Sequence, residues 1–222
     1  MSEKQVITRF APSPSGHLHL GHAYSAMFAQ SAAEERGGRF LLRIEDIDQD
    51  RCMPEFEESI VQDLDWLGLS WEKPVFRQSD HLNNYKTALD MLGQMGVLYP
   101  CFCTRKEILA EIKGAIHAPH ETRLGPDGPI YPGSCRNLPF DERQSRLGSD
   151  EPFALRLNVT QAQSLVGNIQ WNDLDKGPIN GKPDIFGDVV LARKDIPTSY
   201  HLSVTVDDNL QQVTLVTRGE DL

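Results

Sequence analysis

Three histidines stand close together near the start of the chain, in the segment RFAPSPSGHLHLGHA, which covers residues 9–23. The segment follows an expected strand, contains two glycines and leads into an expected helix. Backbone N–H groups and the helix dipole at such a junction attract an anion, most often phosphate. His17, His19 and His22 could donate hydrogen bonds to charge that develops during nucleotidyl transfer. The alternative is a glycine-punctuated turn with ordinary surface or core histidines, because short motifs often match by chance.

A second candidate is the acidic segment LLRIEDIDQDR, residues 41–51. Glu45 falls at the end of an expected strand, and open α/β sheets bind their ligands at the carboxyl ends of strands. We therefore expect Glu45 to take part in ligand binding. Asp48 and Asp50 fit a solvated acidic turn better, because the glycine and the distal glutamate of an EF-hand loop are missing.

Three of the four cysteines offer a metal site: Cys101, Cys103 and Cys135, in the segments YPCFCT and IYPGSC. Thiolates held close together repel one another unless a cation such as Zn²⁺ neutralises them. Zinc here would be structural, since no partner general base is evident. The alternative is three reduced thiols in an ordinary fold. The fourth cysteine, Cys52, stands alone and is expected to be a small apolar filler.

A tetrahedral zinc site also needs a fourth ligand. Tyr131 lies four positions before Cys135, and His117 and His120 lie in the same loop. Imidazole is the commoner zinc ligand, so the residue types alone favour a histidine over the tyrosine.

Two late residues complete the candidates, Tyr200 in SYHLSV and Arg218 in VTRGEDL. An arginine at a strand end can bind a carboxylate or a phosphate through two parallel hydrogen bonds. Taken alone, such an arginine is more often a surface ion-pair residue.

The elements that must position these residues alternate between strand and helix over the first hundred residues. The hydrophobic pattern predicts strands at 6–10 and 40–44. It predicts helices at 24–36 and 54–67, and a third that begins with Ser79 as its N-cap and runs to residue 96. Alternation of this length indicates a parallel sheet with helices on both faces.

The pattern changes near residue 99. Thr104 and Glu107 form a capping box for a short helix, and FALRLNV, residues 153–159, alternates like an antiparallel strand. Further strands are expected at 188–193 and 213–219. We therefore expect three parts: residues 1–100 as the first half of a Rossmann-like domain, 101–186 as an α+β insertion with the metal site, and 187–222 as the incomplete start of the second half.

Composition limits the class of protein. The 222 residues are 39% hydrophobic, 24% charged and 8% aromatic, which suits a folded chain and not a disordered one. The net charge of −10 argues against binding nucleic acid by bulk charge, though not against a local basic stripe. No apolar run approaches the roughly 18 residues of a membrane span, and the N-terminus lacks an apolar signal core. We expect a soluble cytoplasmic protein.

Four segments in order resemble the catalytic domain of glutamyl-tRNA synthetases, which are class I aminoacyl-tRNA synthetases. They are RFAPSPSGHLHLGHA, FLLRIEDIDQDR, YHLSVTVDD and VTRGEDL, and HLGH resembles the family's HIGH motif. The resemblance covers nearly all 222 residues, and its four ordered motifs are specific. It implies a Rossmann-like α/β fold that activates glutamate with ATP and Mg²⁺.

The resemblance also assigns roles to residues. His19, Gly21 and His22 would bind ATP, and the two imidazoles would stabilise the phosphate under attack. The glutamate-binding residues would be Arg9, Ala11, Ser13, Glu45, Tyr200 and Arg218. Two arginines and one acid complement the two carboxylates and the ammonium group of glutamate, and each charge-assisted hydrogen bond would contribute about 1.5–3 kcal/mol. Which arginine takes which carboxylate is left open.

Within this family, the pattern Cys-x-Cys…Tyr-x-x-x-Cys resembles the glutamyl-Q tRNA(Asp) synthetases, a short paralogous group that attaches glutamate to the queuosine base in the anticodon of tRNA(Asp). This resemblance implies one structural zinc per chain, with Tyr131 as its fourth ligand. The insertion would hold the tRNA. Candidates for phosphate contacts are its basic residues Arg105, Lys106, Lys113 and Arg123. A monomer with no membrane partner is expected.

The family's KMSKS-like loop, whose lysine grips the ATP phosphates, normally lies beyond residue 222. We therefore expect these residues to be part of a longer protein rather than an impaired enzyme. Two other functions fit the same residues. One is the catalytic half of an ordinary glutamyl-tRNA synthetase, which charges tRNA(Glu). The other is a non-catalytic synthetase-like module that binds tRNA or a protein partner.

Overall fold

The computed structural model describes residues 5–115, 124–126 and 128–219. The chain divides into two compact units, residues 1–85 with 203–222, and residues 86–202. This division does not follow the three ranges expected from the sequence, whose assignment to functional domains remains a prediction. None of the described helices is long and apolar enough to cross a lipid bilayer.

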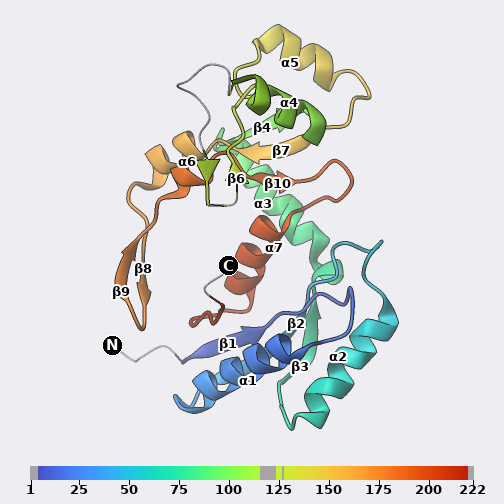
Figure 1. Ribbon diagram of the computed structural model, residues 1–222, viewed down its shortest axis with the longest axis vertical. Helices are drawn as coiled ribbons and strands as arrows, with labels where there is room; N and C mark the ends of the chain where they lie inside the picture. The colour runs from blue at the N-terminus through green and yellow to red at the C-terminus, as the bar shows by residue number, and fades with distance from the viewer. Residues whose placement is uncertain (1–4, 116–123, 127, 220–222) are drawn as a thin grey trace. The chain divides into compact units, whose positions relative to one another are not determined.

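The first unit contains a sheet of three parallel strands in the order β1 (Ile7–Phe10), β2 (Arg39–Ile44) and β3 (Glu72–Arg77). Helix α1 (Leu20–Glu34) connects β1 to β2, and α2 (Pro54–Trp66) connects β2 to β3 (Figure 1). Parallel neighbours require crossover connections of this kind. The structure therefore confirms the parallel sheet that the strand–helix alternation predicts.

The two faces of this sheet have different neighbours. Phe10, Leu42 and Ile44 pack with α1 and α2 in one hydrophobic core. Because successive side chains of a strand point to opposite faces, Arg9 and Arg43 lie on the other face. There they are bonded to helix α7 (Tyr200–Leu210), which covers this side of the sheet (Figure 1). Helices thus lie on both faces, and the polar face is the one that carries the candidate glutamate-binding residues of β1.

Local signals set the helix limits in this unit. Helix α1 begins at Leu20, four residues earlier than the hydrophobic pattern predicts, because His19 caps its first turn. Its buried residues are all alanines, which lets the helix approach the sheet closely. Helix α2 begins with Pro54, whose ring suits a first helical position, and carries two glutamates in its first turn that complement the helix dipole.

Two elements differ from expectation. The sequence analysis does not predict β3, because EKPVFR opens with charged residues and contains a proline. Conversely, residues 213–219 were expected as a strand and are coil. The N–H groups of Thr214 and Leu215 both donate to the carbonyl of Ile7, at 3.0 and 3.1 Å, instead of forming a ladder with β1.

The second unit is built on an antiparallel sheet in the order β10 (Val190–Ala192), β7 (Ala154–Leu157) and β4 (Leu98–Cys101). The structure confirms the antiparallel strand predicted at 153–159. The strand expected at 188–193 also forms, but it pairs with β7. Two hairpins follow in the described chain: β5 (Leu124–Gly125) with β6 (Gly128–Pro129), and β8 (Gln170–Asp173) with β9 (Gly177–Asn180). The remaining helices are α3 (Leu82–Gln94), α4 (Arg105–Ala115), α5 (Phe140–Leu147) and α6 (Val159–Val166). Two 3₁₀ turns, η1 (Gln78–His81) and η2 (Pro183–Ile185), complete the described elements.

The start of α4 confirms the predicted capping box. The N–H of Glu107 donates to Thr104 Oγ1 at 3.2 Å, and the N–H of Thr104 donates to Glu107 Oε2 at 2.7 Å. Two donors that have no partner inside the helix are thereby satisfied. The basic residues Arg105 and Lys106 are exposed on this first turn, while Arg123 and the side chain of Lys113 lie outside the described part.

Candidate functional site

The two histidines of HLGH form the N-terminal cap of α1. The N–H of Gly21 donates to His19 Nδ1 at 3.1 Å, and the N–H of His19 donates to His22 Nδ1 at 3.2 Å. The two rings stack with their centroids 3.8 Å apart. Burial and the neighbouring His19 lower the pKa of His22, so its imidazole is neutral at physiological pH.

These contacts also fix which ring nitrogen faces outward. Because Nδ1 of each ring accepts a backbone hydrogen bond, a ring in its neutral form carries its proton on Nε2. His19 is exposed and His22 is half-buried, so both Nε2–H groups are available as donors at the start of the helix. The arrangement can bind an anion with two imidazole donors and the helix dipole.

His17 has a different environment from the other two histidines. Its Nδ1 lies 3.1 Å from Ser59 Oγ, and its ring meets Phe56 edge-on at 5.0 Å. Both partners belong to α2, so His17 packs the loop against that helix, in line with the ordinary structural role that the sequence analysis left open.

A buried charge cluster joins the ends of β1 and β2. Asp208 Oδ1 accepts from Arg9 Nε at 3.0 Å and from Arg43 Nη1 at 2.7 Å. Arg43 also pairs with Glu45 Oε1 at 3.3 Å and with Asp207 Oδ2 at 3.9 Å. Arg9 and Glu45, which the sequence proposes as ligand-binding groups, are therefore connected through two residues on the polar face of one sheet.

Further groups from η1, from α3 and from α7 with the turn after it complete this cluster. Asp207 is fully buried and accepts from Gln78 Nε2 at 2.7 Å and from the hydroxyl of Tyr85 at 2.8 Å. Gln211 Oε1 accepts from Arg43 Nη1 at 3.0 Å. Desolvation raises the pKa of Asp207 and that of Tyr85, so the tyrosine remains a neutral donor.

Sequence reasoning missed Arg43, Asp207 and Asp208. Arg43 is a charged residue in the middle of FLLRI, an apolar strand, and its side chain has no exposed surface. A buried arginine requires carboxylate partners. That signal was present in the sequence and points to acids elsewhere in the chain, although it does not say which ones.

Glu45 has an unusual pKa. Burial raises it from 4.5 to about 7, although Arg43 and Arg9 act in the opposite direction. The side chain is 12% exposed and belongs to a cluster of two guanidinium groups and three carboxyl groups. A half-protonated Glu45 leaves this cluster closer to neutral when no ligand is present. An arriving ammonium group would favour the ionised carboxylate.

The loop that follows β1 is bonded to the residues around Glu45. The N–H of Glu45 donates to the carbonyl of Pro12 at 2.9 Å, and Ser13 Oγ lies 3.6 Å from Cys52 Sγ. The thiol of Cys52 is also 3.9 Å from the carbonyl of Glu45. Cys52 thus lies beside the candidate site, and its polar contacts correct the expectation of a simple apolar filler. Ala11 lies in the same loop and is half-buried.

The acidic residues after Glu45 divide between two roles. Asp46 accepts from the N–H and the hydroxyl of Ser79, at 2.9 and 2.6 Å, and so ties the end of β2 to η1. Ser79 was expected as a helix cap and instead serves this link. Asp50 is exposed, as expected for a solvated turn.

The two remaining predicted glutamate-binding residues are Arg218 and Tyr200. Arg218 is exposed in the coil after α7. Tyr200 is 53% exposed, is the first residue of α7 and belongs to the second unit. Their roles in glutamate binding remain predictions.

The second candidate site is the thiol cluster of the second unit. The sulfur atoms of Cys101, Cys103 and Cys135 lie within 4.8 Å of one another, and the first and last are buried. Cys103 Sγ is 3.3 Å from Cys135 Sγ. Zn–S bonds of about 2.3 Å place the sulfurs of a tetrahedral site about 3.8 Å apart. The three thiols are therefore spaced closely enough to ligate one zinc ion.

Tyr131 offers an oxygen to the same cluster. Its hydroxyl is 3.4 Å from Cys101 Sγ and 3.6 Å from Cys103 Sγ, and it accepts from the N–H of Cys135 at 2.9 Å. Arg156 stacks on its ring with the guanidinium carbon 4.0 Å from the centroid. The donor set of three sulfurs and one oxygen fits a tetrahedral cation. The alternative ligands His117 and His120 lie outside the described residues.

The thiol cluster lacks a charge balance of its own. Burial raises the pKa of the Cys103 thiol to about 12 and also raises that of the Tyr131 hydroxyl. Protonated groups of this kind must lose their protons to bind a metal. A divalent cation would supply the compensation that their surroundings do not.

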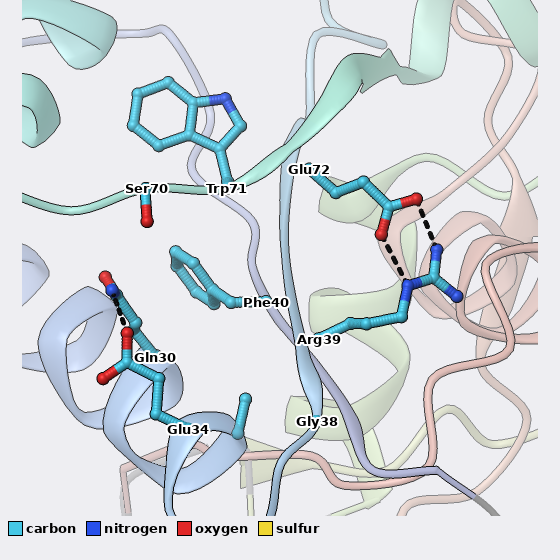
Figure 2. Close-up of a pocket in the computed structure, with 9 residues that line it drawn as sticks. Gln30, Glu34, Gly38, Arg39, Phe40, Ser70, Trp71 and Glu72 are labelled. Carbon is cyan, nitrogen blue, oxygen red and sulfur yellow. Dashed lines mark hydrogen bonds and ion pairs between the residues drawn. The ribbon is translucent and has the colours of Figure 1, made fainter.

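A surface cavity lies in the first unit, where α1 ends and β2 and β3 begin. Figure 2 shows it between α1, β2 and the start of β3, and none of the predicted site residues lines it. Its charged groups are already paired: Gln30 with Glu34, and Arg39 with Glu72. We assign no chemistry to it.

The fold and the HLGH-capped helix define the class of protein. The chain belongs to the family described as "tRNA synthetases class I (E and Q), catalytic domain", which matches residues 5–222. This family has the Rossmann-like catalytic fold that the sequence motifs imply.

Several relatives are similar over nearly the whole chain. The glutamyl-Q tRNA(Asp) synthetase of Rhodobacter capsulatus is 49% identical over 98% of this chain and 77% of its own length. The glutamate–tRNA ligase of Aquifex aeolicus is 40% identical over 98% of this chain and 43% of its own length. Among solved structures, a glutamate tRNA ligase from Elizabethkingia meningosepticum, in complex with its amino acid, superposes with a TM-score of 0.78 at 29% identity. It matches 98% of this chain and 44% of its own length.

Proposed function

We propose that this chain activates glutamate with ATP to form glutamyl-adenylate and pyrophosphate, and transfers the glutamate to the queuosine base in the anticodon of tRNA(Asp). One observation carries the first half of the proposal. Arg9 and Glu45, a cation and an acid, are connected through Asp208 and Arg43 at the carboxyl end of a parallel sheet. Ligands bind at this edge in open α/β folds.

Glutamate would be recognised by its three charged groups. Arg9 would bind one carboxylate and Glu45 the ammonium group, while Arg218 would bind the second carboxylate. Ala11, Ser13 and Tyr200 would position the amino acid. Glutamine carries one carboxylate fewer and would leave an arginine without its charged partner, which supports discrimination against it.

ATP would be bound at the start of α1. The Nε2–H groups of His19 and His22 would donate to the α-phosphate as the glutamate carboxylate attacks it, and Gly21 allows the close approach of phosphate to the helix. Bound Mg²⁺ would neutralise phosphate charge when present. In its neutral form each ring carries its proton on Nε2, because a backbone N–H group donates to its Nδ1.

The proposed metal is one structural zinc, held by Cys101, Cys103, Cys135 and Tyr131. When bound it would supply charge compensation and crosslink β4 to the loop at 131–135. The second unit would contact the tRNA, with Arg105 and Lys106 as phosphate-binding candidates.

A second candidate function is charging of tRNA(Glu) at its 3′ end. It is favoured by the similarity to a glutamate–tRNA ligase at 40% identity. The queuosine target is supported by the higher identity, 49%, to a glutamyl-Q tRNA(Asp) synthetase and by the larger share of that protein that this chain spans.

Isotope exchange tests the activation step. We expect the full-length protein to catalyse glutamate-dependent exchange of pyrophosphate into ATP in the absence of tRNA. Arg9→Met should abolish it, whereas Arg39→Met, which removes an exposed arginine from the neighbouring strand, should not change it. Binding of glutamate and ATP without any exchange would instead support a non-catalytic module.

Transfer experiments separate the two tRNA targets. Labelled glutamate should be attached to tRNA(Asp) that contains queuosine, and not to the same tRNA with guanosine at that position. After ribonuclease cleavage the label should stay with the anticodon fragment. Labelling of the 3′ end of tRNA(Glu), with none on tRNA(Asp), would select the second candidate.

A further inference from the structure

Asp208 binds two arginines with one oxygen atom. Its Oδ1 accepts from Arg9 Nε at 3.0 Å and from Arg43 Nη1 at 2.7 Å. The Asp208 side chain is 22% exposed, that of Arg9 11%, and that of Arg43 not at all. Hydrogen bonds between charged groups are stronger where the side chains are partly or fully buried, so these bonds fix the orientation of both guanidinium groups.

The contact with Asp208 leaves one edge of Arg9 unused. A guanidinium group has an inner donor, Nε, and two outer nitrogens, Nη1 and Nη2. Asp208 engages the inner one. Across the described residues, no protein acceptor is bonded to the outer two. The outer edge is therefore the one that can bind a ligand carboxylate through two parallel bonds.

Asp208 is also the link between Arg9 and Glu45. Arg43 Nη1 binds Asp208, and the other nitrogens of Arg43 lie 3.3 Å from Glu45 Oε1. The continuous path is Arg9, Asp208, Arg43 and Glu45. A cation for a carboxylate and an acid for an ammonium group are thereby held at a fixed separation, which is what recognition of one amino acid requires.

We propose that Asp208 is a positioning residue for amino-acid binding: it holds Arg9 by its inner nitrogen, presents the outer edge to the ligand carboxylate, and couples Arg9 to Glu45 through Arg43. The inference rests on the proposed function, since the ligand is taken to be glutamate. Asp208 itself does not touch the ligand.

The test compares Asp208→Ala with Gln211→Ala. Gln211 accepts from the same nitrogen of Arg43, at 3.0 Å, but has no bond to Arg9. Both variants remove an acceptor from Arg43, but only Asp208→Ala also removes the partner of Arg9 Nε, and Asp208→Asn separates that bond from the loss of charge. A positioning role would weaken glutamate binding in Asp208→Ala alone.

We expect the Kd of L-glutamate, measured by calorimetry on the full chain, to rise about 10- to 100-fold in Asp208→Ala. It should change less than about threefold in Gln211→Ala. The Kd of ATP should be unchanged in both variants. In exchange kinetics the loss should be in the KM for glutamate, with kcat nearly constant.

Asp208→Asn provides a second variant, which keeps the shape and one acceptor oxygen and so tolerates folding better. Its Kd should lie between those of the wild type and Asp208→Ala. A double-mutant cycle with Arg9→Lys, which lacks the inner guanidinium nitrogen, should show that Asp208→Ala adds little further loss.

The outcomes separate the two levels of the proposal. If the wild-type chain binds no glutamate, the proposed function fails. If it binds glutamate and Asp208→Asn and Asp208→Ala match Gln211→Ala, the positioning role is refuted. Additive losses in the cycle with Arg9→Lys would also overturn it, because they would show that Asp208 does not act through Arg9.

Discussion

The charge cluster around Arg43 and the thiol cluster around Tyr131 solve the same problem in different ways. Both bury polar groups that water would otherwise stabilise. In the first, the protein supplies both signs of charge, because Arg9 and Arg43 face Glu45, Asp207 and Asp208. In the second, the converging groups are thiols and a phenol, none of which carries a positive charge, so the proposed zinc ion would balance the negative charge that they take on when they bind it.

This difference separates what each region needs in order to fold. The charge cluster is complete once β1, β2, η1, α3 and α7 are in place, and the charges that balance one another there all belong to the chain's own side chains. The proposed zinc site would make the thiol cluster depend on an external metal ion and on the supply of that ion. The stability of the charge cluster should therefore depend on charge substitutions and on pH. The stability of the thiol cluster should depend on metal ions and chelators.

The largest expected effect is on the metal. In Cys135→Ala, zinc content should fall from about one ion per chain to none, because removal of a buried thiolate opens the coordination shell. Zinc sites of this kind contribute on the order of 10 kcal/mol to folding. Elemental analysis after dialysis, together with the unfolding midpoint with and without chelator, measures the effect.

Cys52→Ala is the control for the metal measurement, since Cys52 is a thiol of the other unit. It should keep one zinc and the chelator sensitivity of the wild type. Full zinc content in Cys135→Ala would remove that residue from the site and weaken the contrast between the clusters.

The next largest effect is expected from Arg43→Met, which should destabilise the chain by about 3–5 kcal/mol, because three carboxylates lose a buried cationic partner. Urea unfolding measures it. Arg39→Met provides the comparison, as it breaks an ion pair that is largely exposed and should cost no more than about 1 kcal/mol. An equal loss of unfolding free energy in Arg43→Met and Arg39→Met would show that the buried charge of Arg43 does not stabilise the cluster.

The titration of Glu45 should make stability depend on pH. Its folded-state pKa is raised from 4.5 to about 7. The corresponding stability is fully present below pH 4.5 and is lost as the pH rises through 7. Glu45→Gln should lack this loss, so its stability relative to the wild type should increase by on the order of 3 kcal/mol between pH 4.5 and pH 8.

Glu72→Gln gives a comparison of opposite sign for the pH experiment. A hydrogen bond from Arg39 lowers the pKa of Glu72, so the wild type should lose stability relative to Glu72→Gln as the pH falls. If the free energies of unfolding of Glu45→Gln and the wild type differ by the same amount at every pH between 4.5 and 8, Glu45 does not titrate as its burial implies.

The smallest effect should come from the helix start next to the thiol cluster. Thr104→Ala removes one side of the capping box of α4 and should cost about 1 kcal/mol without changing zinc content. Thermal unfolding with zinc present measures it. A loss of zinc in this variant would mean that the helix cap supports the metal-binding loop.

The sequence predicts most of the regular elements and the grouping of the cysteines. Helix α2 agrees with its prediction at both ends, because Pro54 and a glycine at 68 mark the limits clearly. The prediction of a strand at 213–219 is wrong. Alternation of apolar residues does not reveal whether another strand has an unpaired edge with which the segment could form a ladder. Strand β3 is missed for the converse reason: its pairing with β2, and not its own composition, makes it a strand.

The candidate sites divide in the same way. The sequence finds Arg9 and Glu45 because they lie in recognisable motifs. It cannot find Asp208, which is 199 positions from Arg9 and meets it only in the folded chain. The choice of Tyr131 over a histidine as the fourth zinc ligand came from the family resemblance, and the structure describes Tyr131 but not the competing histidines.

The cap of α1 gives one pair of histidines two tasks, one structural and one proposed. His19 and His22 hold the helix start through Nδ1, and in the proposed function they serve phosphate through Nε2. An alanine at either position would lose helix nucleation and anion binding together. Asparagine, which retains a short acceptor for the backbone, would allow the two losses to be separated.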